Sequence, residues 1–485
     1  MFQTMPSIVG RSLGGLSSPW PIILFSLYSV YLSSAMTFPV LGKGAAGLLL
    51  LVGILGGYRL KRHFYVLTAT EKWLGTSFIL FSVVSIVSFF YWPQSRESRM
   101  HLEDYSTFMM LVPLYLLLRQ FHFNVKCLVV LLSLAAISLG IYSLVQEFIF
   151  GIPRSGGAVN SMRYAGVSLV LASISLNVIL AFRQKTLGFK ILLMLAVCMG
   201  LIACLLTQVR GAWLVIPFLV VAYCAYLRRT FPPKFLYLMI IGAVVLTVSV
   251  SQMQVVQGRV QVTIDNFELY QQGDAQTSIG ARLDMFKAAV ILIKEKPVWG
   301  HGLHSYSPKA TEIRQNTPGM SDQVGVWANP HNEILQVWVE KGFIGLVTLL
   351  LLFVVPAYLF IKALKISNEA VRFYAMSGLS ILMVYAVLGQ SVALFEHDVF
   401  NHFFALMVLL FASQIRVVEY MEDRIGLGGG LTSNVLADYR LGCSGLMNLD
   451  TNLGGKLPPS EFLKVVVAFI FTLPVTSLQD LILHG

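Results

Sequence analysis

Residues 343–361 read FIGLVTLLLLFVVPAYLFI, an unbroken stretch of 19 residues without a charged side chain. A helix that crosses a membrane needs about 20 mainly apolar residues, so this stretch predicts a transmembrane helix. The same composition recurs along the chain of 485 residues, which is 56% hydrophobic and only 12% charged. Soluble domains carry about 25% charged residues. The composition therefore excludes a soluble, disordered or disulfide-rich protein and predicts a polytopic membrane protein.

We predict an all-α fold with about twelve transmembrane helices. Each candidate span is a mainly apolar run bounded by polar or charged positions. The spans are 19–36, 39–58, 74–92, 105–118, 127–149, 164–182, 190–208, 212–227, 235–254, 343–361, 373–394 and 400–415. An even number of spans places both ends of this core on the same side of the membrane.

Lysine and arginine are divided unevenly between the two sets of connections. With the N-terminus inside, the inner connections hold about three times as many Lys and Arg residues as the short outer ones. This bias follows the positive-inside rule and predicts an inner N-terminus. It also accounts for much of the formal net charge of +11, so we expect no nucleic acid partner.

Residues 255–342, between the ninth and tenth spans, form a long loop on the outer side. The loop contains a predicted amphipathic helix that begins near Arg282 and ends at Pro297. Its expected apolar face consists of Leu283, Phe286, Val290 and Ile293.

Residues 425–485 form a C-terminal tail of different composition. The tail opens with a glycine-rich linker, Gly426–Gly430, and no mechanism is evident in it. We therefore divide the chain into a transmembrane core, 1–424, and a tail of unknown role, 425–485.

Two arginines on the outer side are candidates for binding an anion. Arg210 opens the stretch Arg210-Gly-Ala-Trp213, at a span boundary where an arginine is costly unless it snorkels, pairs or binds a ligand. It is either an interface anchor, with Trp213 in the aromatic belt, or a bidentate donor to phosphate. Arg282 is either a solvated helix residue or part of an anion site near a helix N-terminus.

Histidines gather in the second half of the outer loop. Residues 299–304 read Trp-Gly-His-Gly-Leu-His, and residues 328–333 read Ala-Asn-Pro-His-Asn-Glu. Asn329 fits a helix N-cap and Pro330 the first helical position, which predicts His331 in the first turn. The helix dipole there disfavours imidazolium and keeps the ring neutral, as a general base requires. His331 is either that base or a structural histidine.

The last outer loop holds Glu396-His397-Asp398, followed by Asn401 and His402. These residue types suit a metal site, but three adjacent residues cannot all converge without an unusual turn. The alternative is a polar network that supports another site. The sequence has no Asp-x-Asp pair for a metal-bound sugar donor and no phosphate-binding GxxxxGK[ST] loop. We expect neither a metal nor a cofactor.

Three sequence motifs, in the order in which they occur, resemble those of the O-antigen ligase and polymerase superfamily. The motifs are Arg210-Gly-Ala-Trp213, Arg282 with Pro297-x-Trp-Gly-x-Gly302, and Pro330-His-Asn-Glu333 with Glu340-x-Gly342. The resemblance covers about residues 15–420. Within the superfamily, the chain is most similar to the O-antigen ligases, which complete lipopolysaccharide at the periplasmic face of the bacterial inner membrane. The tail has no counterpart there.

The resemblance implies an inverting membrane glycosyltransferase. It would transfer a glycan from undecaprenyl pyrophosphate to a sugar hydroxyl of lipid A–core oligosaccharide, with its active site facing the periplasm. His331 would be the general base, and Arg210 and Arg282 would bind the donor pyrophosphate without a metal. The expected supporting residues are Trp213, His301, Asn332, Glu333, Glu396 and Asp398.

Two alternatives remain open. An O-antigen polymerase or a protein O-glycan transferase would use the same donor with a different acceptor. A polytopic solute transporter would share the basic, apolar composition. Transporters of that kind often contain inverted repeats with broken helices at the membrane midplane, and no convincing repeat is present in the sequence.

Overall fold

The computed structural model is helical throughout, apart from one short pair of strands. It describes residues 10–12, 20–58, 67–90, 96–182, 186–227, 234, 241 and 254–426. The helices are α2 (Trp20–Ser34), α3 (Pro39–Tyr58), α4 (Ala69–Phe89), α5 (Arg96–Met110), α6 (Val112–Leu118), α7 (Val125–Leu144) with a π-helical turn η2 (Val145–Ile149), α8 (Ser161–Ala181), α9 (Leu187–Leu206), α10 (Arg210–Leu227), α12 (Gln254–Gln271), α13 (Ser278–Glu295), α14 (Tyr306–Gln315), α15 (Glu333–Ala363), α16 (Glu369–Leu388) and α17 (Asp398–Gly426). The strands β1 (Gly10–Ser12) and β2 (Phe121–Phe123) pair antiparallel, a contact that the sequence did not predict.

Nine helices in the described part of the chain are long and apolar enough to cross a membrane. They are α3, α4, α7 with η2, α8, α9, α10, α15, α16 and α17. Helix α2 is equally apolar but shorter, with 15 residues. The chain is therefore an all-α polytopic membrane protein, as its composition predicts, with nine to ten candidate spans in the described residues.

Two predicted spans account for the difference from twelve. Residues 105–118 do not form one helix, because α5 ends at Met110 and α6 begins at Val112. Pro113 lies at the start of α6, where a residue without an N–H group is tolerated, whereas a helix interior would lose a hydrogen bond. The predicted span 235–254 lies outside the described residues, apart from positions 241 and 254.

The C-terminal boundary also differs from the prediction. Helix α17 continues to Gly426, so the first glycine of the predicted linker ends a helix. Residues 427–485, and with them most of the predicted tail, lie outside the described residues.

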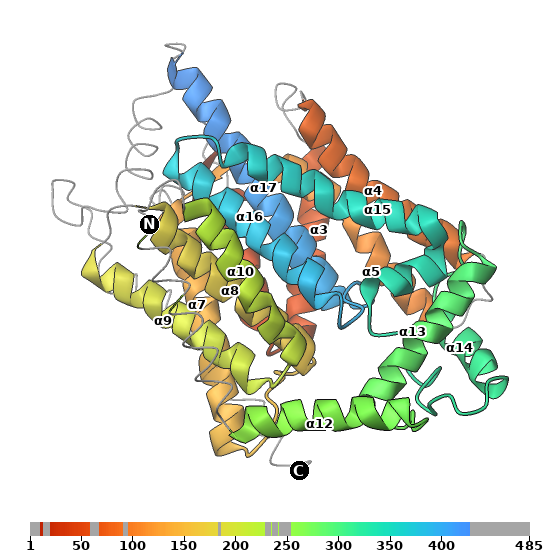
Figure 1. Cartoon of the computed structure of the whole chain (residues 1–485). Helices are drawn as coiled ribbons and strands as arrows, with labels where there is room; N and C mark the ends of the chain where they lie inside the picture. Colours follow the sequence, from red (N-terminus) through yellow and green to blue (C-terminus); the bar gives the residue numbers. More distant parts are fainter. Residues whose placement is uncertain are drawn as a thin grey trace.

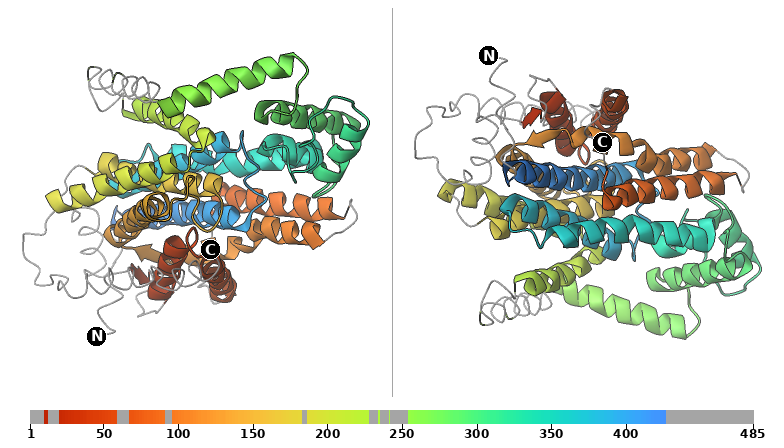
Figure 2. Two further views of the ribbon diagram at one scale, coloured as in Figure 1. Left: turned by 90° about the horizontal axis from the view of Figure 1, so that it is seen from below. Right: turned by 90° about the horizontal axis from the view of Figure 1, so that it is seen from above.

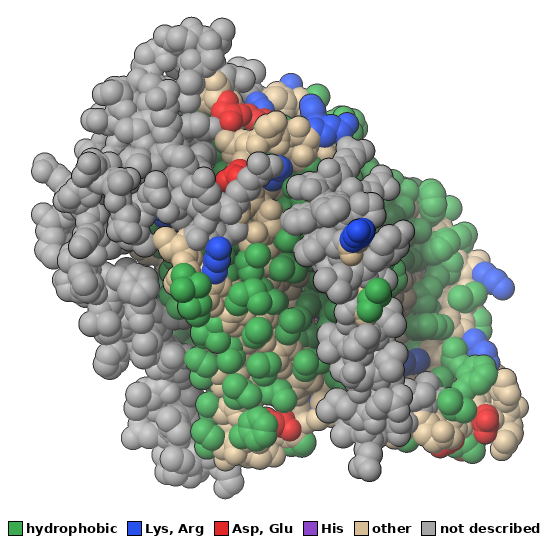
Figure 3. All heavy atoms as spheres, turned by 60° about the vertical axis from the view of Figure 1, so that its left-hand side comes forward, with side chains coloured by type: hydrophobic (Ala, Val, Ile, Leu, Met, Phe, Trp, Pro, Cys, Tyr) green, Lys and Arg blue, Asp and Glu red, His purple; other side chains and the backbone are tan. Residues whose placement is uncertain are grey.

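Helices α8, α16 and α17 are the most deeply buried spans, and α16 packs against both others (Figure 1). Around them, α4 packs against α5 and α15, while α9 packs against α7 and α8. Seen from below and from above, α2 and α3 lie on one side of the bundle and α12 on the other (Figure 2). Hydrophobic side chains cover the middle of the described surface on one face (Figure 3), as contact with lipid requires.

Helices α12, α13 and α14 lie beside the bundle (Figure 2), and a second, small hydrophobic core joins α13 and α14 to the first turns of α15. Asp284 on α13 ties this region together. Its carboxylate accepts a hydrogen bond from the Tyr270 hydroxyl at 2.6 Å and another from the Ser321 N–H at 2.9 Å. The long loop therefore contains helices, as predicted, although its last residues, 333–342, belong to α15.

The predicted apolar face of the amphipathic helix is partly wrong. In α13, Met285, Ala288 and Leu292 are buried, whereas Val290 is exposed. The reason is that α13 packs against α14 and α15 and turns its small alanines toward these neighbours.

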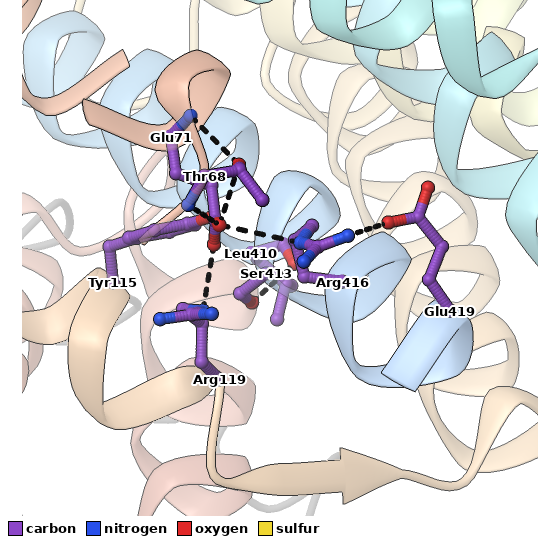
Figure 4. Close-up of polar contacts among 8 residues, drawn as sticks. All are labelled: Thr68, Glu71, Tyr115, Arg119, Leu410, Ser413, Arg416 and Glu419. Atoms are coloured by element: carbon purple, nitrogen blue, oxygen red, sulfur yellow. Dashed lines mark hydrogen bonds and ion pairs between the residues drawn. The ribbon is translucent and has the colours of Figure 1, made fainter. Parts of the chain in front are cut away.

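At one end of the bundle, a buried ion cluster joins three helices (Figure 4). We call it the Glu71 cluster: Thr68, Glu71, Tyr115, Arg119 and Arg416. One Glu71 oxygen lies 2.8 Å from Arg119 Nε and accepts the Tyr115 hydroxyl at 2.8 Å. The other accepts the Thr68 hydroxyl at 2.8 Å and lies 3.4 Å from Arg416 Nε. Both carboxylate oxygens are thus compensated, and the start of α4, the end of α6 and α17 are held together.

Candidate active site

At the opposite end of α4, helix α15 is interrupted at Gly342, whose backbone has φ 64° and ψ −165°. The interruption frees two carbonyl groups in the preceding turn. The Val339 carbonyl accepts the N–H of His301 at 2.8 Å, and the Glu340 carbonyl accepts the N–H of Gly302 at 2.9 Å. In return, the N–H of Phe343 donates to the Pro297 carbonyl at 2.8 Å. We call residues 297–302 the strap, because they bridge the break in α15.

Two glycines make this contact possible. A Cβ on Gly300 would lie 2.5 Å from the carbonyl carbon of Glu340, and a Cβ on Gly342 would lie 2.1 Å from the Val298 carbonyl oxygen. Both residues have positive φ, a region that side chains disfavour. The motifs Pro297-x-Trp-Gly-x-Gly302 and Glu340-x-Gly342 are therefore two halves of one backbone contact.

His331 lies immediately before the start of α15, and the predicted helix start was wrong. The N-cap is Asn332, whose side chain accepts the N–H of Leu335 at 3.0 Å. Asn329 instead accepts the N–H of His331 at 3.0 Å, and His331 has φ 54°. A left-handed residue cannot lie in a helical turn, so the helix begins at Glu333.

The His331 imidazole is half-buried and lies beside an exposed indole. Its ring centroid is 5.6 Å from that of Trp327. Burial lowers the pKa of His331 below its usual value, and the positive charge of Arg282 lowers it further. Both effects favour the neutral imidazole near pH 7, which is the form that accepts a proton.

Arg210, Arg282 and His331 belong to one electrostatic neighbourhood. Arg210 is the first residue of α10, and Arg282 lies near the start of α13. Arg282 is exposed at the surface, but partial loss of hydration lowers its pKa, and the charge of Arg210 lowers it further. Since Arg282 in turn affects His331, three residues from distant parts of the sequence act on one another. Two guanidinium groups that repel each other form a favourable site for an anion.

Residues 389–391 connect the start of α10 to the start of α15. Gly211, next to Arg210, packs directly against Ser391. On the other side, the Gly389 carbonyl accepts the N–H of Glu333 at 2.7 Å, and the Gln390 carbonyl accepts the Asn332 amide at 3.3 Å. This loop therefore fixes Arg210 relative to the segment that carries His331.

The predicted supporting residues have separate positions. Glu333 is buried, and one of its oxygens accepts the N–H groups of Leu394 and Phe395 at 2.5 and 3.1 Å. The side chain of His301, a residue of the strap, is buried, and its Nε2 lies 2.9 Å from the Leu292 carbonyl oxygen. A carbonyl only accepts hydrogen bonds, so Nε2 carries the proton. Both residues hold loops in place.

Two other predicted supporting residues, Asp398 and Trp213, make described contacts that do not involve His331. Asp398 forms an ion pair with Lys43 at 2.5 Å, which joins α17 to α3. Trp213 is half-buried against the bundle core, and its indole N–H has no hydrogen-bond partner among the described residues. Glu396, by contrast, is buried and accepts the Asn329 amide at 2.6 Å.

Sequence reasoning missed the inner half of this site. Gln336 and Lys341 are buried on the first turns of α15, between Glu333, Glu340 and Glu396. We call these five residues the carboxylate cluster. The Lys341 ammonium lies 3.3 Å from the centroid of the Tyr105 ring. The spacing of Glu333, Gln336 and Glu340 on one helical face was the signal that could have revealed the cluster.

No group of three or more His, Cys, Asp or Glu side chains is arranged to hold a metal ion within the described ranges of the chain. The predicted absence of a metal remains a prediction. A cleft of about 90 Å³, lined by residues such as Leu219, Tyr226 and Leu364, lies nearer the other ends of α10 and α15, away from His331.

Two comparisons with known proteins report similar sequences. An uncharacterised protein from Haemophilus influenzae is 24% identical over 357 residues, which cover 71% of this chain and 86% of that protein. Residues 194–350 match the O-antigen ligase family, and this range contains Arg210, the strap, His331 and the break in α15. The resemblance seen in the sequence is thereby confirmed over residues 194–350, which are similar to the O-antigen ligase domain family.

Proposed function

We propose that this protein is an O-antigen ligase of the bacterial inner membrane. It transfers a glycan from undecaprenyl pyrophosphate to a sugar hydroxyl of lipid A–core oligosaccharide, at the periplasmic face. The observation that carries the proposal is the grouping of two mutually repelling arginines with a neutral histidine. A pyrophosphate leaving group and an acceptor hydroxyl require these two functions.

The reaction is a single displacement with inversion at the anomeric carbon. The acceptor oxygen forms a bond to that carbon as the bond to the pyrophosphate oxygen breaks. His331 takes the hydroxyl proton, and undecaprenyl pyrophosphate leaves with the bonding electrons. Charge accumulates on the leaving group in an oxocarbenium-like transition state. Arg210 and Arg282 stabilise it with paired, charge-assisted hydrogen bonds.

The position of His331 suits this role. Its ring is half-buried and neutral, and it lies just before a helix N-terminus, where backbone N–H groups and the helix dipole favour negative charge nearby. The arginines lie at the starts of two other helices, α10 and α13. Lipid-linked donor and acceptor can both reach an end of a transmembrane bundle by lateral diffusion.

The test is a reaction with purified protein, undecaprenyl-pyrophosphate-linked glycan and lipid A–core. We expect labelled glycan to become attached to lipid A–core. A polymerase would extend another lipid-linked glycan, a protein glycan transferase would need a protein acceptor, and a transporter would form no product.

His331→Asn is the informative variant, because asparagine tolerates positive φ but is no base. We expect its kcat to be lower by roughly 10²- to 10⁴-fold, the usual contribution of general acid–base catalysis. His304→Asn is the matched control, since His304 also has positive φ, 62°, and should remain close to wild type. Normal turnover of His331→Asn would disprove the role of His331.

A further inference from the structure

The backbone conformation of His331 needs an external support. Its φ of 54° is rare for a residue with a Cβ. His331 precedes the N-cap of α15, so no helical hydrogen bond holds its N–H group. That group donates instead to the Asn329 side-chain oxygen at 3.0 Å. The direction of the imidazole therefore depends on where Asn329 is fixed and on how its amide is turned.

Glu396 decides how that amide is turned. The Asn329 Nδ2 group donates to Glu396 Oε2 at 2.6 Å. A carboxylate only accepts hydrogen bonds, so it faces the NH₂ side of the amide and leaves the oxygen for His331. If the Asn329 amide were reversed, its oxygen would face the Glu396 carboxylate, which is also an acceptor. Its NH₂ group would face the His331 N–H, which is also a donor.

Glu396 is in turn held by Gln336, another member of the carboxylate cluster. Gln336 Nε2 donates both to Glu396 Oε1 and to Glu340 Oε1, each at 2.6 Å. Glu340 Oε1 also accepts the N–H of His304, just after the strap, at 2.6 Å. Glu396 is 3% exposed and Gln336 is fully buried, so water does not compete for these contacts. The chain of hydrogen bonds runs without interruption from the break in α15 to His331.

We propose that Glu396 is a positioning residue for glycan transfer: through Asn329, it fixes the backbone of His331 and thereby aims the imidazole at the acceptor hydroxyl. This inference rests on the proposed function of His331 as the base. Glu396 itself touches neither substrate and takes up no proton.

Exchanging the carboxylate and the amide between positions 396 and 329 tests which side chain donates and which accepts in this contact. In Glu396→Gln, both neighbours still present NH₂ groups to position 396, so one hydrogen bond is lost in either orientation of the new amide. In Asn329→Asp, two carboxylates face each other. In the double variant, the new carboxylate at 329 accepts from His331 and from the new amide at 396. That amide's oxygen accepts from Gln336, and the total charge is unchanged.

We expect each single variant to lower kcat by roughly 10- to 100-fold, as for other residues that orient a reacting group, with both KM values within about twofold of wild type. The double variant should recover to within about fivefold of wild type, which gives a large coupling in the double-mutant cycle. Glu312→Gln is the matched control, because the same substitution is made at an exposed side chain.

A second readout does not depend on activity. In histidine-labelled protein, the NMR signals of the His331 imidazole should move in both single variants and return in the double variant. If Glu396→Gln does not fold, the comparison of Asn329→Asp with the double variant still decides.

A normal kcat for Glu396→Gln, or a double variant no faster than Asn329→Asp, would overturn the inference. If these results occur while His331→Asn is inactive, only the positioning role fails. If His331→Asn is fully active, the proposed role of His331 fails first, and the NMR signals alone then report on the contact.

Discussion

The Glu71 cluster and the carboxylate cluster lie at opposite ends of α4 and use buried charge differently. In the Glu71 cluster, one carboxylate lies between two arginines and also accepts two hydroxyl groups. The partners belong to α4, α6 and α17 or lie at their ends, so charge pairing joins helices. Such a cluster is complete without any ligand.

The carboxylate cluster has three carboxylates for one lysine, and its oxygens hold loops. Glu333 accepts two backbone N–H groups of the last loop, and Glu340 accepts the N–H of His304. Glu396 holds Asn329, which holds His331. Loops positioned by a rigid scaffold are where catalytic residues usually lie. The difference teaches that buried charge maintains the bundle at one end and shapes the candidate active site at the other.

The largest expected effect comes from making the same substitution at both ends. Glu71→Gln removes the carboxylate that two largely buried arginines share, and Arg416 then keeps Glu419. We therefore expect the free energy of unfolding to fall by about 3 kcal/mol. The kcat of the protein that remains folded should be unchanged, because no contact of Glu71 reaches His331. Thermal unfolding in detergent, together with the transfer rate per folded molecule, measures both quantities.

Glu396→Gln should give the opposite pattern, with a large loss of kcat and a smaller loss of stability. If both variants lose mainly stability, or both mainly kcat, the contrast between the two ends is wrong.

The next effect concerns the arginines. Arg210→Lys and Arg282→Lys should each cost about 2–4 kcal/mol of transition-state stabilisation, a rate loss of roughly 30- to 1000-fold. The reason is that an ammonium group cannot make the planar, paired contact of a guanidinium with phosphate. Steady-state rates of the purified variants give the values. Arg314→Lys, at a half-buried arginine whose hydrogen bond in the described part of the chain is to a backbone carbonyl, serves as the control and should be neutral. A lysine variant at 210 or 282 with wild-type kcat would argue against pyrophosphate binding there.

The sequence predicted the helices well because the membrane imposes a simple rule. Uncharged runs such as residues 343–361 must be helical, since lipid offers no other partners to the backbone. The same rule gives no sign of the break in α15. The apolar run begins directly after Gly342, and periodicity does not reveal that strap residues far earlier in the chain bond to Val339 and Glu340.

The site was harder to predict because its details depend on contacts across the chain. The sequence predicted Asn329 as the N-cap of α15, whereas the structure has Asn332 in that position. The choice is settled by Glu396, 67 residues after Asn329, which binds the Asn329 amide and leaves Asn332 to cap the helix. The grouping of Arg210 with Arg282 followed from the family resemblance and not from their spacing.

A smaller effect concerns two histidines whose pKa values are lowered. His331 lies at the end of the bundle that holds the carboxylate cluster, and His122 lies at the end that holds the Glu71 cluster. Burial alone lowers the pKa of His122, on β2 near Arg119, to about 4. The pKa of His331 is lowered by burial and then by Arg282. Arg282→Gln should therefore raise the pKa of His331 without restoring its usual value, since burial remains. It should leave His122 unchanged. NMR titration of labelled histidines resolves both. Equal movement of both resonances would indicate a general change of structure, and no movement would remove Arg282 from the neighbourhood of His331.

The smallest expected effect is that of a chelator, which should leave the transfer rate unchanged. The surplus of carboxylates near His331 is where a divalent cation would be sought, and the predicted cluster of Glu396, His397, Asp398 and His402 is the alternative place.

The contacts of these residues argue against a metal at either place. Each Glu396 oxygen already accepts an amide N–H, Asp398 pairs with Lys43, and His402 Nδ1 bonds to the Asp398 carbonyl at 2.6 Å. A metal there would have to displace these donors, whereas in the proposed mechanism the arginines supply positive charge for the pyrophosphate. If EDTA abolishes transfer by the purified protein and Mg²⁺ or Mn²⁺ restores it, the carboxylates at this end bind a metal and the arginine-only mechanism is wrong.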